Sequence, residues 1–169
     1  MTNKKEIIAS IIIIGNEVLS GRTKDLNTST LSIWLNSIGI SVQEVRVIPD
    51  IERKIIDTVN ALRTKFDYVF TTGGIGPTHD DITAESISKV FNSKYDFHDE
   101  AFSILEKYYE PGEFNEGRQK MAKMPTIAKL ILNPSSGAPG FYVENVFCLP
   151  GVPSILKSML GGLNNLLVG

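Results

Sequence analysis

The chain has 169 residues, of which 42% are hydrophobic and 21% are charged, and its formal net charge is −2. This near-neutral charge gives no electrostatic reason to expect a nucleic acid or an anionic membrane as a partner. The longest purely aliphatic run, Ile11 to Ile14, is far too short to span a bilayer. The N-terminal apolar run has no small-residue cleavage site after it, so we expect no secretory signal. The single cysteine, Cys148, excludes an internal disulfide and is typical of a reducing cytoplasm, where we expect the protein.

Strand-like and helix-like segments alternate along the first half of the chain. Residues 6–14 form a nearly continuous apolar run, rich in isoleucine, which predicts a strand covered on both faces. A helix is expected to follow, with Asn27 or Thr28 as its N-cap and Gly39 at its end. Such alternation indicates an α/β fold with a parallel sheet between helices. The spacing predicts strands at residues 6–14, 41–48 and 66–72, and helices at residues 25–39, 51–64 and about 82–91.

The alternation breaks in the second half. Residues 92–125 suggest two short helices around Pro111-Gly112, after which strand character returns at residues 128–133 and 142–150. A last helix is predicted at about 153–160. There are no repeats and no low-complexity linker, so we expect residues 1–169 to form one domain with an irregular helical insertion at about 92–125.

The order of the strands predicts where a ligand would bind. In a parallel sheet the carboxyl ends of the strands lie along one edge, and ligands bind there. The strands are followed by residues suited to a site: Gly15-Asn16-Glu17, Pro49-Asp50, Thr72-Gly73-Gly74 and Pro150-Gly151. We therefore expect the site at this carboxyl edge.

A glycine loop, TTGGIGPTHDD at residues 71–81, joins the third strand to the next helix. Successive glycines let backbone N–H groups approach a ligand, and the start of a helix near Ile82 favours an anion such as phosphate. No Gly-Lys-Ser/Thr follows, and the third glycine of the dinucleotide fingerprint is missing. The plain alternative is a tight strand-to-helix turn without a ligand.

Two acids, Asp80 and Asp81, end this loop. One of them is expected as an N-cap, but two carboxylates beside a phosphate site would repel the ligand. The arrangement is favourable when a divalent cation such as Mg²⁺ bridges acid and phosphate. Asp50 and Glu17, at neighbouring strand ends, would complete the metal site or supply a base. This chemistry suits attack on a phosphoanhydride.

Other chemically active residues have plainer interpretations. His79 has only His98 as a histidine companion and no Cys/His cluster, so a zinc site is not expected. Cys148 lies between Phe147 and Leu149, which indicates a buried strand residue and not a nucleophile. Arg118 and Lys120 either reach a phosphate or belong to a solvated face.

The string TTGGIGPTHDDITAE (71–85) resembles the signature of the molybdopterin-binding domain shared by MogA, MoaB, gephyrin and MoeA. The resemblance is strongest to the N-terminal domain of the competence-damage-inducible CinA proteins. Further similar stretches follow in family order and cover essentially the whole chain: GNEVLSGRTKDLNT (15–28), VIPD (47–50), RQKMAKMP (118–125), NPSSGAPGF (133–141) and LPGVP (149–153).

The resemblance implies a three-layer α/β/α sandwich, with a mostly parallel sheet, that binds a phosphorylated pterin or nucleotide. Asp50 and Asp81 match the acids assigned to metal-assisted chemistry, and Asp80 joins them as a candidate metal ligand. The first loop, GxExLxGxxxDxN, matches the CinA branch, which is associated with metal-dependent hydrolysis of ADP-ribose. The resemblance and the edge argument together assign ligand binding to Gly15, Glu17, Asn27, Thr72, Gly73, Gly74, Gly76, Pro77, Thr78, Gly137, Pro139, Gly140, Pro150 and Gly151.

The sequence also departs from the family pattern. Ser136-Gly137-Ala138-Pro139-Gly140 stands where Gly-Thr-Ala-Pro-Gly is expected, so the glycine is shifted. CinA proteins often continue into a nicotinamide-nucleotide amidase domain, and no amidase activity is assigned to this chain.

Three hypotheses follow. The first is a divalent-metal-dependent pyrophosphatase of ADP-ribose or a related nucleotide, and the second is a molybdopterin adenylyltransferase. The third is a binding module for a nucleotide or molybdopterin without turnover. The expected partner is a small phosphorylated nucleotide or pterin, with no nucleic acid and no membrane, and the resemblance suggests a homo-oligomer, either dimer or trimer. If the loop is a phosphate cradle, Gly74→Ala should weaken binding more than stability.

Overall fold

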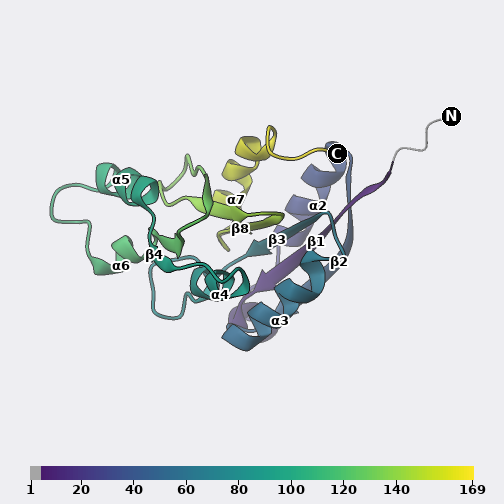
Figure 1. Ribbon diagram of the computed structural model, residues 1–169, viewed down its shortest axis with the longest axis horizontal. Coiled ribbons are helices and arrows are strands. Elements are labelled where there is room, and N and C mark those ends of the chain that lie inside the picture. The colour runs from purple at the N-terminus through teal and green to yellow at the C-terminus, as the bar shows by residue number, and fades with distance from the viewer. Residues whose placement is uncertain (1–4) are drawn as a thin grey trace.

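The computed structural model describes residues 5–169, so the part of the secretory-signal prediction that rests on residues 1–4 lies outside the described residues. Its centre is a six-stranded sheet with the strand order β2-β1-β3-β8-β7-β6 (Figure 1). Strands β1, β2, β3 and β8 are parallel, and β7 alone runs against its neighbours on both sides. The strands are β1 (Ile7–Ile14), β2 (Ile40–Ile48), β3 (Tyr68–Thr72), β6 (Lys129–Ile131), β7 (Gly140–Val143) and β8 (Val146–Leu149).

Helices cover both faces of the sheet, as the sequence predicts. Leucines of α2, at Leu31 and Leu35, pack on one face together with α7, and α3 and α4 pack on the other face. The helices are α1 (Asn16–Leu19), α2 (Asn27–Ser37), α3 (Glu52–Arg63), α4 (Thr83–Val90), α5 (Asp99–Tyr108), α6 (Glu116–Lys120), α7 (Pro153–Met159) and the 3₁₀ turn η1 (Leu160–Leu163). The expected α/β sandwich with a mostly parallel sheet is confirmed.

Strand β1 shows why the core divides into two layers. Its side chains alternate between the faces, so Ile11 and Ile13 join the cluster under α2 and α7, whereas Ile12 and Ile14 join the one under α3 and α4. All four are at most 3% exposed, which confirms the predicted strand covered on both faces. Cys148 of β8 is fully buried in the second of these clusters, and its burial raises the pKa of the thiol to about 12, so it is not a reactive nucleophile.

Four details of the sequence interpretation were wrong. Neither Asp80 nor Asp81 caps α4, because its N-cap is Ile82 and no side chain of the described chain makes a cap hydrogen bond there. Residues 142–150 do not form one strand: the chain reverses at Glu144, whose φ is 52°, and makes the hairpin of β7 and β8. Neither Asn27 nor Thr28 caps the start of α2. Instead the Oδ1 of Asp25 accepts hydrogen bonds from the N–H of Asn27 at 2.9 Å and from the N–H of Thr28 at 3.2 Å. Short β4 (Tyr95–Phe97) and β5 (Lys123–Pro125) pair in a second, two-stranded sheet that the sequence pattern did not indicate.

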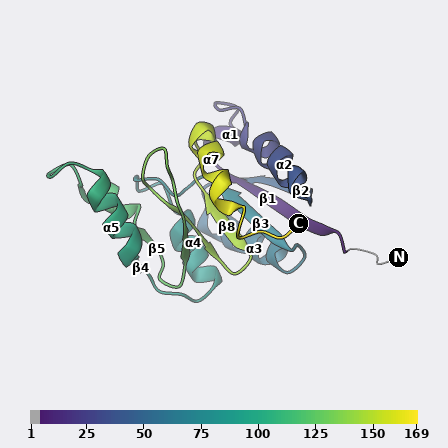
Figure 2. The same cartoon turned by 90° about the horizontal axis from the view of Figure 1, so that it is seen from above.

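Residues 92–125 project to one side of the sheet, with α5 at the outer end (Figure 2). The two short helices on either side of Pro111-Gly112 are present as α5 and α6. This segment still touches the sheet's loops, since a Cβ on Gly137 would lie 2.7 Å from the ring of Tyr108. None of the helices in residues 5–169 is long and apolar enough to cross a membrane.

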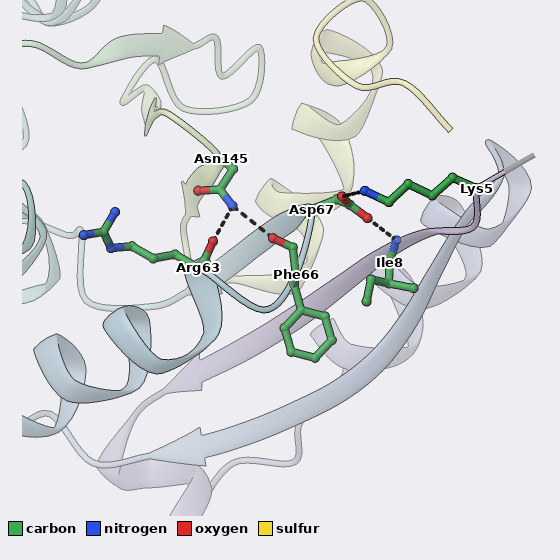
Figure 3. A network of polar contacts seen from close by, with 6 residues as sticks. All are labelled: Lys5, Ile8, Arg63, Phe66, Asp67 and Asn145. Atoms are coloured by element: carbon green, nitrogen blue, oxygen red, sulfur yellow. Dashed lines mark hydrogen bonds and ion pairs between the residues drawn. The ribbon is translucent and has the colours of Figure 1, made fainter.

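Polar contacts tie the strands together at the amino edge of the sheet (Figure 3). The carboxylate of Asp67 accepts from the N–H of Ile8 at 2.9 Å and lies 3.3 Å from the ammonium of Lys5, which joins the starts of β1 and β3. The side-chain amide of Asn145 donates to the carbonyls of Arg63 at 2.9 Å and Phe66 at 3.1 Å, so it caps the end of α3. This edge is therefore held by side chains that make structural contacts.

Candidate functional site

The carboxyl ends of β1 and β3 lie side by side at the opposite edge. The chain leaves β1 toward α2 on one face of the sheet, and it leaves β3 toward α4 on the other face. Ligands of such sheets bind where the chain direction splits in this way. Gly15 follows β1 and Gly73 follows β3, so both glycines lie at the position where a ligand site is expected.

The glycine loop after β3 is shaped by two left-handed residues. Gly73 has φ +97° and Gly74 has φ +76°, a region that residues with a side chain rarely adopt. A Cβ on Gly73 would overlap the carbonyl of Ile14, and one on Gly74 would overlap Thr83 Oγ1. Thr83 Oγ1 donates to the Gly73 carbonyl at 2.9 Å, and the Thr83 N–H donates to the Gly74 carbonyl at 3.0 Å. The first helical residue of α4 thus closes the loop from behind.

This geometry makes Gly74→Ala a poor test of ligand binding. Its positive φ and the overlap with Thr83 would strain the folded chain whether or not a ligand binds. The expectation that binding would suffer more than stability is therefore corrected for this position.

The loop carries three successive backbone donors beside a pocket. The N–H groups of Gly74, Ile75 and Gly76 have no hydrogen-bond acceptor among residues 5–169. These residues line a pocket of about 520 Å³, which we call the glycine-loop pocket. Its walls also include Glu17, Thr23, Gly73, Pro77, Asp81, Met121, Asn133, Ser136, Ala138, Pro139, Pro150, Gly151, Val152, Pro153 and Ile155.

Asp81 is held in this pocket by the loop itself. Its Oδ2 accepts from the N–H and from the Oγ1 of Thr78, both at 2.9 Å. A Cβ on Gly76 would lie 2.9 Å from the same oxygen, so glycine makes room for the carboxylate. Oδ1 has no hydrogen-bond partner among the described residues. Asp81 therefore keeps one oxygen for a ligand or an ion.

Asp50, after β2, is fixed by a reciprocal pair with Asn16. The Asn16 N–H donates to Asp50 Oδ2, and the Asp50 N–H donates to Asn16 Oδ1, both at 3.1 Å. Partial burial raises the pKa of the Asp50 carboxyl, the bond from Asn16 opposes this, and the negative charges of Glu17, Asp81 and Asp80 raise it further. Asp50 and Asp81 thus come from different strand ends and influence each other electrostatically.

The carboxylates lie in two adjoining hollows. Asp81 lines the glycine-loop pocket, whereas Asp50 and Asp80 line a second hollow of about 430 Å³, which we call the carboxylate hollow. Glu17 lines both. The carboxylate hollow is completed by Asn16, Ser20, Arg22, His79 and Ile82.

The donor set limits how a metal could bind. Within residues 5–169, no three His, Cys, Asp or Glu side chains lie close enough to hold a metal ion by themselves. Mg²⁺ is commonly bound through one or two carboxylates together with phosphate oxygens and water. The open Oδ1 of Asp81 and the surplus negative charge around Asp50 fit this mode, and they do not fit a cation held by protein ligands alone.

The other sequence-predicted residues fall into two groups. Glu17, Gly73, Gly74, Gly76, Pro77, Pro139, Pro150 and Gly151 line the glycine-loop pocket. Thr78 is exposed and supports Asp81, whereas Asn27 and Thr72 are buried around a smaller cavity of about 40 Å³ that shares Gly151 with the pocket. Asn27 donates from Nδ2 to the Gly151 carbonyl at 2.9 Å.

Gly15, Gly137 and Gly140 do not line the pocket, and packing explains each of them. Gly15 is buried, and a Cβ there would overlap the carboxylate of Glu17. Gly137 has φ +79° and lies against Tyr108. A Cβ on Gly140 would lie 2.6 Å from the carbonyl of Cys148.

Several residues of the site were given no role by the sequence analysis. Asn16 fixes Asp50, Thr83 closes the glycine loop, and Asn133 builds the loop before β7: its Oδ1 accepts from the N–H groups of Ser135 and Ser136. The Asn-Pro-Ser-Ser string is a turn signal that indicates such a role for Asn133. Asn16 and Thr83 act through contacts that become visible only in three dimensions.

The sequence is similar to a CinA-like protein and to an archaeal protein. It is 38% identical over 153 residues to a CinA-like protein of Geotalea uraniireducens, which covers 87% of this chain and 36% of that protein. It is 37% identical over 158 residues to a protein of Caldivirga maquilingensis, covering 90% of this chain and 62% of that protein. The chain therefore spans only part of the length of these relatives.

The fold is similar to solved structures of the same kind. The crystal structure of the protein CinA with unknown function from Thermoplasma acidophilum superposes with a TM-score of 0.87 at 32% identity, covering 94% of this chain and 96% of that one. The molybdopterin biosynthesis enzyme MoaB of Thermus thermophilus superposes with a TM-score of 0.64 at 17% identity over 95% and 91% of the two chains, which shows a shared fold alone. The profile of the family described as "probable molybdopterin binding domain" matches residues 10–167, and the chain belongs to this family.

Proposed function

We propose that the glycine-loop pocket binds a phosphorylated nucleotide or pterin, and that the domain hydrolyses a nucleotide pyrophosphate such as ADP-ribose with the help of a divalent cation. The observation that carries this proposal is the row of N–H groups at Gly74, Ile75 and Gly76, which lack acceptors in the described chain and lie beside Asp81. Backbone donors of this kind bind phosphate oxygens and stabilise charge that develops on them.

The rest of the pocket suits a flat heteroaromatic ring. Apolar side chains of Ile75, Met121, Val152 and Ile155 form much of its wall. A volume of about 520 Å³ is within the range of small-molecule sites. A base or a pterin ring would lie against this wall while its phosphates reach the loop.

The carboxylates would have separate tasks. Asp50 and Asp81, with Asp80 close by, would hold the divalent cation, which supplies charge neutralisation and Lewis acidity when bound. Thr78 orients Asp81 and Asn16 orients Asp50 through the bonds described above. Glu17, which lines both hollows, would accept a proton from the attacking water.

Incubation with ADP-ribose and Mg²⁺, Mn²⁺ or Co²⁺ tests the proposal. AMP and ribose phosphate should appear with the wild-type chain and fall by at least about 100-fold with Asp81→Asn, which keeps the side chain's size. Asp67→Asn at the amino edge is the matched control and should retain activity. Failure to form AMP with any of these cations, or full activity of Asp81→Asn, would contradict hydrolysis at this site.

A second candidate is transfer of an adenylyl group from ATP to molybdopterin. It is favoured by the family profile, whose description names molybdopterin binding. Adenylylated molybdopterin formed from ATP, without AMP release from ADP-ribose, would support transfer. Tight binding of molybdopterin without either reaction would support a binding module.

A further inference from the structure

Lys120, the last residue of α6, reaches across to the exit of the glycine loop. Its Nζ donates to the carbonyl of Asp81 at 2.8 Å and also to the carbonyl of Thr78. It makes no ion pair among the described residues, so these carbonyl oxygens are its polar partners there. A residue about 40 positions away in the sequence thus holds two peptide groups of the loop.

These two bonds also fix the opposite side of the loop. In a planar trans peptide the N–H of the next residue points away from the carbonyl. With the carbonyls of Thr78 and Asp81 turned toward the Lys120 ammonium, the N–H groups of His79 and Ile82 point away from that ammonium. Both N–H groups lack an acceptor among residues 5–169, and both residues line the carboxylate hollow.

The same contacts place the ammonium beside the site. Lys120 lines a small cavity together with Asp81, Gly74, Ile75 and Gly76, which also belong to the glycine-loop pocket. The neighbouring backbone is tight as well, because a Cβ on Gly117 of α6 would lie 3.4 Å from the carbonyl of Pro77. The end of α6 therefore packs directly on the loop that carries Asp81.

We propose that Lys120 is a positioning residue that holds residues 78–82 in the ligand-binding arrangement. By fixing the two carbonyls it orients the Asp81 carboxylate and turns the amides of His79 and Ile82 toward an incoming diphosphate. Its positive charge offsets part of the negative charge of the surrounding carboxylates. The ligand in this inference is taken from the proposed function, whereas the positioning role rests on the contacts of Lys120.

Three variants test the proposal. Lys120→Met removes the donors, Lys120→Arg keeps a cation that can bridge two carbonyls, and Lys123→Met is the matched control. Lys123 lines the same small cavity, but its ammonium lies over the Phe97 ring at 5.0 Å from the centroid. Binding of inorganic pyrophosphate and of AMP with Mg²⁺ present would be measured by calorimetry. Lys120→Met should weaken pyrophosphate binding by about ten- to hundredfold, whereas Lys120→Arg and Lys123→Met should stay within about threefold of wild type.

Amide hydrogen exchange gives a readout that needs no ligand. The N–H of Thr78 donates to Asp81 Oδ2 and that of Asp81 donates to the Thr78 carbonyl at 3.1 Å, so both should exchange at least tenfold faster in Lys120→Met. Unchanged exchange at these amides would overturn the positioning role, as would equal loss of pyrophosphate binding in Lys123→Met. If the wild-type chain binds neither pyrophosphate nor AMP, the proposed function fails, and the exchange result still decides the role of Lys120.

Discussion

Folding shifts the pKa values of two aspartates, one at the carboxyl edge and one at the amino edge of the sheet, in opposite directions. Folding raises the pKa of Asp50, through burial and the nearby carboxylates, and lowers that of Asp67, through the N–H of Ile8 and the ammonium of Lys5. Asp50 therefore costs stability when it is ionised, whereas Asp67 contributes stability in the same state. Groups held in unfavourable electrostatic surroundings are frequent at functional sites. The charge pattern thus agrees with a site at the carboxyl edge.

Because of these opposite pKa shifts, we expect the change from aspartate to asparagine to have opposite effects on stability at the two positions. At pH 7, Asp50→Asn should raise the free energy of unfolding and Asp67→Asn should lower it, each within about 1 kcal/mol, because both carboxylates are partly exposed. The protonated Asp50 carboxyl stabilises the folded chain relative to the ionised form. This contribution is fully present below the ordinary pKa of 3.8 and is lost as pH rises through the raised native pKa. The ionised Asp67 carboxylate also stabilises the folded chain. Its contribution is present above the ordinary pKa of 3.8 and is lost as pH falls through the lowered native pKa.

Urea unfolding between pH 3 and pH 7 measures both effects. The difference in stability between each variant and wild type should shrink as pH falls, and only Asp50→Asn should lose activity with ADP-ribose. A destabilised Asp50→Asn at pH 7 would mean that the carboxylate has a mainly structural role.

At the scale of elements, the glycine loop combines positions that serve the fold with positions that serve the site. Gly73 and Gly74 need left-handed backbone and lie against Ile14 and Thr83, so a side chain at either position would strain the folded chain. Gly76 has no positive φ, and its nearest neighbour is the carboxylate of Asp81. The two kinds of glycine can therefore be separated by substitution.

Alanine at these positions should give contrasting results. Gly74→Ala should destabilise the chain by about 2 kcal/mol or more, because of the positive φ and the overlap with Thr83. Gly76→Ala should cost under about 1 kcal/mol, since the Asp81 side chain can move, but it should displace that carboxylate from Thr78 and reduce activity at least tenfold. Thermal unfolding and AMP release measure the two effects. Equal loss of stability in both variants would contradict this assignment.

Elements with a strong hydrophobic period could be predicted from the sequence, and those that depend on tertiary pairing could not. The isoleucine run of β1 and the amphipathic face of α3 were predicted because the spacing of their apolar residues is enough to indicate which side chains are buried. Strands β4 and β5 have three residues each and gain their hydrogen bonds from each other across the chain. Likewise, the edge location of Asp50 and Asp81 followed from strand order, but their division between two hollows depends on side-chain placement.

At the scale of the whole molecule, the sheet separates the polar groups that hold the fold from those that we propose bind the ligand. Parallel strands bring Glu17, Asp50 and Asp81 together at one edge, where the structure leaves donors and carboxylate oxygens unpaired among residues 5–169. At the other edge, Asp67 and Asn145 use their polar groups to tie elements together (Figure 3). The segment with α5 and α6 adds a third part, which contacts the glycine loop through Lys120.

Asn145→Ala tests this separation from the structural side. Loss of the side-chain amide leaves the carbonyls of Arg63 and Phe66 without the donor that caps α3, which should cost about 1–3 kcal/mol. For a chain of this size the melting temperature should fall by about 2–4 °C per kcal/mol. AMP release from ADP-ribose below the transition should stay within about twofold of wild type, because the side-chain hydrogen bonds of Asn145 within residues 5–169 go to Arg63 and Phe66, away from the carboxyl edge. A large loss of activity in the folded variant would show that the two edges are coupled, and the strands between them would then have to transmit a change that the packed core of β1 and β3 is expected to resist.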